Sequence, residues 1–240
     1  PVKPADRLCG TGFQPVEPAD HLCGTGFQPV KPADRLCGTG FQPVEPKALY
    51  DLTGVALVCV RSGPDRVAVY SRRGSATVER RIVGGLRQYR MTVGSDGAEH
   101  DPVGYDADSR TASLVSSGWH SSSEWLAATA GSTCPDFVPQ VVEMFDSPRA
   151  GDLVVFADDQ ASFGDRFAGG HGSCLGSDMV VPLYFSGPDL PAGGRIPAGR
   201  IVDVMPTILD LLGLGDRLDR AGPIDGVSLA EALRTAGQGR

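Results

Sequence analysis

Residues 55–93 carry the strongest hydrophobic pattern in the chain. The run VALVCV, residues 55–60, is apolar throughout and predicts a buried strand that ends at turn residues. Residues 66–81 alternate between apolar and polar positions on both sides of an RRG turn, which is the pattern of a β-hairpin. Residues 86–93, LRQYRMTV, alternate in the same way. These patterns predict a small antiparallel sheet within residues 47–100, with arginines on its exposed faces.

Helical spacing replaces alternation between residues 101 and 150. In SSSEWLAATA, serines precede Glu124 and then an apolar pair, which predicts the capped start of a helix. DFVPQVVEMF places its apolar side chains at helical spacing, with Asp136 as the expected N-cap and Pro139 in the first turn. Residues 101–150 are therefore expected to form a helical connection.

The last third of the chain, residues 151–240, predicts an α/β layer. The apolar core of GDLVVFADD, residues 153–156, suggests a strand buried on both faces, as in a parallel sheet. MVVPLYFSG, residues 179–187, predicts a second buried strand. DVMPTILDLLG has the features of a helix that Asp203 caps and Gly213 ends, with Val204, Ile208, Leu211 and Leu212 on one apolar face. Strand, loop, strand and helix in this order predict the α/β fold class.

Residues 1–46 are three copies of a fourteen-residue repeat and the start of a fourth. Each copy contains two prolines and two glycines, which exclude a continuous helix and predict an extended or disordered segment. The copies differ only by Lys/Glu and Arg/His exchanges. Such near-identity suggests recently duplicated, repetitive DNA that is read into the frame; the alternative is a flexible spacer.

Composition narrows the choice of partners and compartment. The net charge of -7, with a pI near 5.1, argues against a nucleic-acid partner. No apolar run approaches the roughly 20 residues that span a bilayer. The six cysteines include no CxxC pair, so we expect free, buried thiols and slightly favour the cytoplasm. The chain begins with proline and shows no signal segment, which suggests that its true N-terminus is missing.

Histidines are the first candidates for metal ligands. His100 and His120 lie in polar stretches and are expected to be exposed and without a role. His171, in GGHGS, lies on a loop beyond the carboxyl end of a predicted strand, where sites in α/β sheets gather. By itself it is either a metal ligand or, more commonly, a turn histidine. The same alternatives, weak metal binding or turn capping, apply to the nearby carboxylates Asp158, Asp159, Asp165 and Asp178.

Four segments together resemble a known family. GGHGS, DMVVPLYFSGPDLPAGGRI, RIVDVMPTILDLLGL and DGVSLAEAL follow in an order that resembles the C-terminal end of the alkaline phosphatase superfamily. The nearest branch is the type I phosphodiesterase/nucleotide pyrophosphatase-like family. SPRAGDLVVFA and the preceding hairpin are similar to the segment that joins the two halves of the catalytic domain in bacterial members. The resemblance covers residues 47–235. Sulfatases and phosphoglycerate mutases share the late strand and helix and remain alternatives.

The resemblance implies an alkaline-phosphatase-like α/β sandwich and a two-metal hydrolase, usually with zinc. Its substrates would be small phosphate esters, and a metal-bound hydroxyl would attack phosphorus. His171 matches the late histidine that binds one metal in this family, and imidazole is a good zinc ligand. The remaining ligands in the family are two from mid-chain, an early aspartate, the Thr or Ser nucleophile and the Asp-His pair of a DHG motif.

This chain departs from the family before the hairpin. It contains no DHG motif, and the repeat stands where the nucleophile and early ligands are expected. The expected protein is therefore a partial domain that is inactive alone, with its N-terminal half lost or encoded elsewhere. The alternative within this reading is a non-catalytic gene remnant.

Overall fold

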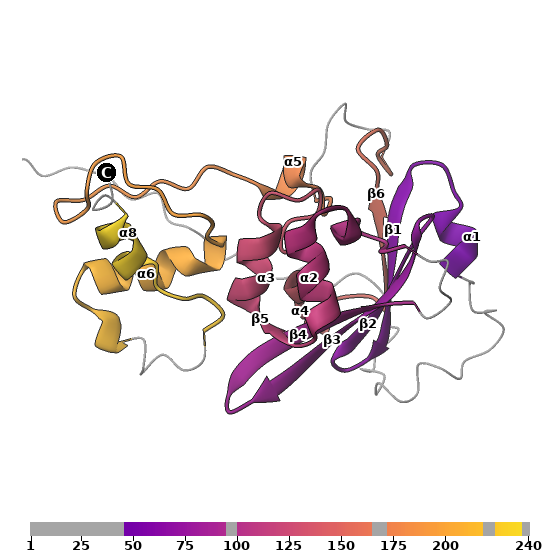
Figure 1. Ribbon diagram of the computed structural model, residues 1–240, viewed down its shortest axis with the longest axis horizontal. Helices are drawn as coiled ribbons and strands as arrows, with labels where there is room; N and C mark the ends of the chain where they lie inside the picture. The colour runs from indigo at the N-terminus through magenta and orange to yellow at the C-terminus, as the bar shows by residue number, and fades with distance from the viewer. Residues whose placement is uncertain (1–45, 95–99, 165–171, 218–223, 237–240) are drawn as a thin grey trace, which may run out of the picture. The chain divides into compact units, whose positions relative to one another are not determined.

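The computed structural model describes residues 46–94, 100–164, 172–217 and 224–236 (Figure 1). All of these belong to one compact unit, residues 44–240. The repeat over residues 1–46, which we expected to be disordered, lies outside the described residues except for Pro46.

A six-stranded sheet with the order β5-β4-β3-β2-β1-β6 forms the centre of the described unit. Every pair of neighbouring strands is antiparallel. The strands are β1 (Val55–Gly63), β2 (Arg66–Ser71), β3 (Gly74–Val83), β4 (Leu86–Val93), β5 (His120–Ser121) and β6 (Leu153–Ala157). The hairpin and the small antiparallel sheet expected between residues 47 and 100 are confirmed.

One face of this sheet builds the core. Val69 pairs with both Cys59 and Ala76 in the register of β1, β2 and β3. Val78 pairs with both Val67 and Met91 in the same way. Because side chains alternate between the faces of a strand, these residues point to one side, and all are buried.

Three helices cover that face: α2 (Ser109–Ser117), α3 (Ser122–Thr129) and α4 (Phe137–Met144) (Figure 1). Trp125 of α3 is fully buried and donates its indole N–H to the carbonyl oxygen of Tyr89 at 3.2 Å. Tyr105, in the short 3-10 helix η2 (Tyr105–Ala107), packs against the Trp125 ring. The other face receives α1 (Pro46–Tyr50), whose Tyr50 stacks on Tyr70.

The helix-start predictions for α3 and α4 meet different outcomes. Ser121 and Glu124 form the expected capping box at the start of α3. Asp136 precedes α4 as predicted, but its side chain makes no capping hydrogen bond and its φ is 56°. Its carboxylate accepts two hydrogen bonds from the guanidinium of Arg200 instead, at 2.5 and 2.6 Å. Asp136 is only 2% exposed, so the demand for a charged partner outweighs the weaker benefit of a cap.

Short elements joined by long loops make up the segment after β6. They are α5 (Gly176–Met179), η3 (Ile201–Asp203), α6 (Val204–Leu211), η4 (Gly215–Arg217) and α8 (Ala230–Thr235). Arg200 connects this segment to the helical layer, since it also donates to the carbonyl oxygen of Ser122 at 2.8 Å.

The predicted parallel layer over residues 151–240 is wrong within the described residues. β6 pairs antiparallel with β1 at the edge of the sheet, and in β6 only Phe156 is buried. A short apolar run does not distinguish such an edge strand from one buried on both faces. Residues 180–187, predicted as a buried strand, have no regular structure, and Tyr184 is 89% exposed. The coarser expectation of a mixed α and β architecture holds.

The helix predicted from DVMPTILDLLG is α6, but a different face is buried. Pro206 and Thr207 are buried, whereas Ile208 and Leu212 of the expected apolar face are exposed. Asp203 does not cap α6 through its side chain; its carboxylate accepts from the backbone N–H groups of Arg200 and Val227. Asp203 therefore satisfies backbone N–H groups of two loops and does not cap the helix.

No helix in the described part of the chain is both long and apolar enough to cross a membrane.

The core face of β3 is covered over only part of its length, which predicts unequal costs for two truncations in this strand. Val78→Ala removes two buried methyl groups from a fully enclosed side chain and should lower the free energy of unfolding by about 2 kcal/mol. Ile82→Ala, in the same strand but 66% exposed, should change it by less than about 0.5 kcal/mol. Urea denaturation of both variants checks this, and equal losses would contradict the described burial of Val78 and exposure of Ile82 along β3.

The buried Asp136 predicts a strong dependence on Arg200. Arg200→Ala leaves a carboxylate without its cation in a buried position and should cost about 3 kcal/mol of stability. Arg110→Ala, which removes the exposed partner of Asp108, should leave the denaturation midpoint unchanged. A midpoint for Arg200→Ala equal to that of Arg110→Ala would show that the pair contributes nothing to folding.

Candidate functional site

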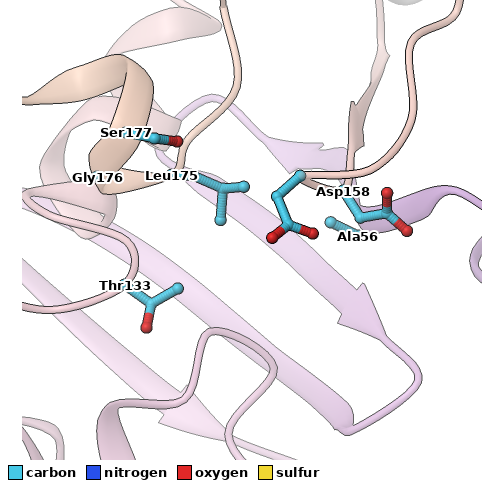
Figure 2. Close-up of a pocket in the computed structure, with 7 residues that line it drawn as sticks. Ala56, Thr133, Asp158, Leu175, Gly176 and Ser177 are labelled. Carbon is cyan, nitrogen blue, oxygen red and sulfur yellow. The ribbon is translucent and has the colours of Figure 1, made fainter.

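A pocket with a volume of about 430 Å³ opens beside the carboxyl end of β6 (Figure 2). Figure 2 shows Asp158 and Ala56 on one side and Thr133, Gly176 and Ser177 on the other, with Leu175 between them. Asp159 completes the lining. The pocket therefore combines two adjacent carboxylates with apolar and hydroxyl groups.

The carboxylate side is held against the start of β1. The backbone N–H of Asp158 donates to the carbonyl oxygen of Gly54 at 2.9 Å. Gly54 has a φ of +85°, and a Cβ at this position would lie 2.7 Å from the Cβ of Ala161. A residue without a side chain is thus required here, both by the backbone conformation and by the close approach of the loop.

The opposite side joins two loops. The backbone N–H of Gly176, the first residue of α5, donates to the carbonyl oxygen of Thr133 at 2.8 Å. This bond brings the loop between α3 and α4 next to the segment that follows residue 171. Four segments distant in sequence, around residues 56, 133, 158 and 175, meet at this pocket.

Two of the aspartates named from the sequence have local partners. Asp158 accepts a hydrogen bond from the backbone N–H of Gln160 at 3.0 Å, and Asp178 accepts one from Ser173 at 3.0 Å. Both contacts are typical of turn-capping carboxylates. His171, the predicted metal ligand, and Asp165 lie outside the described residues.

A zinc pair is not matched by the described residues of this pocket alone. Asp158 and Asp159 supply oxygen ligands, but the described chain contains no group of three or more His, Cys, Asp or Glu side chains arranged to hold a metal. A catalytic zinc normally takes three protein ligands, with histidine prominent among them.

A second polar cluster surrounds His100. Its Nδ1 lies 3.3 Å from Asp106 Oδ2, and Arg73 pairs with Asp106 at 2.8 Å. Burial raises the pKa of Asp101, although its carboxylate accepts from the backbone N–H groups of Val103 and Tyr105 at 2.8 and 2.7 Å. The exposed position expected for His100 is confirmed, since its side chain is 74% exposed.

His120 differs from its prediction. It lies in β5 with a side chain 15% exposed, edge-on to the Trp125 ring, and its Nε2 is 2.9 Å from Ser117 Oγ. Glu124 is 3.7 Å from Nδ1, too far for a hydrogen bond. The Ser117 hydroxyl also lies 2.6 Å from the carbonyl oxygen of Ser113, to which it can donate.

Two features of the site were not predicted from the sequence. Thr133 reaches the pocket from a loop that carried no motif. Gly54 positions the Asp158 loop, and the only sequence signal for it was a glycine directly before a predicted strand.

Comparison of the chain with protein-family models, with curated proteins and with solved structures finds no match.

Because the loop approaches Gly54 closely, replacing this glycine with alanine should cost more stability than its positive φ alone would predict. Gly54→Ala and Gly85→Ala both place a side chain at a similar positive φ, +85° and +82°, which costs about 1 kcal/mol in each. Only Gly54→Ala meets a neighbouring atom, so it should lose roughly 1–3 kcal/mol more. Thermal unfolding measures the difference. Equal losses would mean that the Asp158 loop is not held against β1.

Proposed function

We propose that residues 47–235 are the C-terminal part of a metal-dependent phosphoesterase domain of the alkaline phosphatase type, and that this chain does not hydrolyse phosphate esters by itself. The proposal rests on the resemblance of the HGS, VPLYFSGP and VDVMPTILDLLG segments to that superfamily. In this proposal, the chain contributes His171 and a carboxylate-lined pocket to a centre whose other ligands and nucleophile come from elsewhere.

The observation that supports the proposal is the position of the described residues on either side of the segment that contains His171. Asp158 and Asp159 line the pocket on the N-terminal side of this segment, and Leu175 lines the same pocket on the C-terminal side. His171 lies four positions before Leu175 in the sequence. Four residues of chain span at most about 14 Å, and the proposal takes the imidazole of His171 as a ligand together with the two carboxylates.

The ligand chemistry also supports an incomplete centre. One imidazole and two carboxylates suit a single divalent cation, whereas in-line phosphoryl transfer in this family uses two metals and a hydroxyl nucleophile. The chain has no DHG motif to complete the second metal position. Small phosphate esters are the substrate class of the intact domain in this proposal.

Zinc titration of the full chain tests the metal part of the proposal. Wild-type protein should bind zinc about tenfold more tightly than His171→Ala, because that variant loses the imidazole that the proposal assigns as a ligand. His100→Ala removes an exposed histidine outside the pocket lining and is the matched control. Equal zinc affinity in wild type and His171→Ala would refute His171 as a ligand.

Hydrolysis of bis(p-nitrophenyl) phosphate with added zinc tests the proposed inactivity. We expect the wild-type rate to equal that of His171→Ala. A wild-type rate more than about tenfold above that of His171→Ala, unchanged in His100→Ala, would show that the chain assembles a complete centre.

A further inference from the structure

Two buried cysteines meet beside the pocket. Cys134 Sγ and Cys174 Sγ are 3.9 Å apart, although the residues are 40 positions apart in the sequence. They are 4% and 6% exposed, and both are free thiols. Cys59, the remaining described cysteine, is also buried but lies within strand β1, which pairs with a neighbour on each side.

Both cysteines of the pair lie in loops. Cys134 belongs to the turn between α3 and α4, and Cys174 precedes α5. A disulfide has an S–S length of about 2.05 Å, so the two sulfurs need to approach by about 2 Å. Loop backbone and a change of side-chain rotamer can supply a movement of this size, whereas Cys59 is fixed by strand pairing on both sides.

The contacts around the pair keep the two loops together in the reduced protein. The Gly176 N–H donates to the Thr133 carbonyl oxygen at 2.8 Å, and the Tyr105 hydroxyl donates to the Cys134 carbonyl oxygen at 2.6 Å. These bonds align the chain directly before Cys134 with the chain directly after Cys174. Bond formation between the sulfurs therefore does not require the loops to find each other.

We propose that Cys134 and Cys174 are a redox-active dithiol that forms an intramolecular disulfide with a small disulfide oxidant such as oxidised glutathione. One cysteine thiolate attacks the oxidant, whose S–S bond breaks to release one thiol and leave a mixed disulfide. The second cysteine attacks the mixed disulfide, forms the Cys134–Cys174 bond and releases a second thiol. Two electrons and the two cysteine protons pass to the oxidant in all.

The hydrogen bond to Cys174, together with burial, raises the pKa of the Cys134 thiol. Little thiolate is therefore present in the closed form, and the first attack requires transient opening of the loop that carries one of the cysteines. The reduced cysteines therefore react slowly with oxidants while the loops are closed. Once one sulfur becomes accessible and reacts, the other is close enough to complete the disulfide.

The disulfide would act on the pocket. Thr133 directly precedes Cys134 and Leu175 directly follows Cys174, and both residues line the pocket. A covalent bond between their neighbours fixes the spacing of these two lining residues. Oxidation therefore sets the width of the pocket opposite Asp158 and Asp159.

Peptide mapping of the folded, full-length chain tests this inference. The protein is incubated with oxidised glutathione, its remaining thiols are blocked with N-ethylmaleimide, and it is digested with trypsin. Cys134 lies in the tryptic peptide 111–149 and Cys174 in the peptide 167–195. We expect the main oxidised product of either cysteine to be these two peptides joined by one disulfide. Dithiothreitol should separate them.

Matched variants separate the pair from general oxidation. Cys59→Ser should retain the cross-linked peptides, while Cys174→Ser should abolish them and leave Cys134 blocked by N-ethylmaleimide or carrying glutathione. Amide exchange at Gly176 should slow about tenfold on oxidation of the wild type and stay unchanged in Cys174→Ser. The inference would be overturned if folded wild-type protein gave the two peptides only as separate adducts, with no joined product. This test uses the wild-type chain alone and does not depend on whether a variant folds.

Discussion

Burial of one face of an antiparallel sheet is the constraint on which the described structure depends. Strands β1 to β4 place Cys59, Val69, Val78 and Met91 on a single side, where α2, α3 and α4 cover them. When apolar and polar side chains alternate along the strands of an antiparallel sheet, one face is apolar, and one layer of helices is enough to cover it. Trp125 fills the space between sheet and helices, and its hydrogen bond to Tyr89 fixes the depth at which α3 packs.

Buried polar groups decide how the later part of the chain joins this core. Asp136 and Asp203 are both almost inaccessible to solvent, and each has at least one partner in a loop distant in sequence. Arg200 and Asp136 are 64 positions apart in the sequence, and their hydrogen bonds join the C-terminal segment to the helical layer. Isolated buried carboxylates are costly, so these pairings restrict the arrangement more than the exposed apolar residues of α6 do.

The pocket at the end of β6 combines the features that bear on function. Its two carboxylates follow β6, and the nearby cysteines lie in the loops before α4 and α5. Backbone hydrogen bonds to the carbonyl oxygens of Gly54 and Thr133 hold these segments together. A metal-ligand role for this pocket depends on His171, whereas the Cys134–Cys174 contact is a property of described residues. The two proposals therefore concern the same pocket but stand on separate observations.

The sequence by itself determined the strands of the small sheet, the RRG hairpin, the capping box at Ser121 and the three helices that begin at residues 122, 137 and 204. These features depend on periodicity and on contacts within one turn, which a linear pattern contains. Only the tertiary structure decided the antiparallel edge position of β6, the partner of Asp136 and the meeting of Cys134 with Cys174. Such contacts join residues 40 or more positions apart, and no local pattern records which distant group will lie opposite a buried side chain.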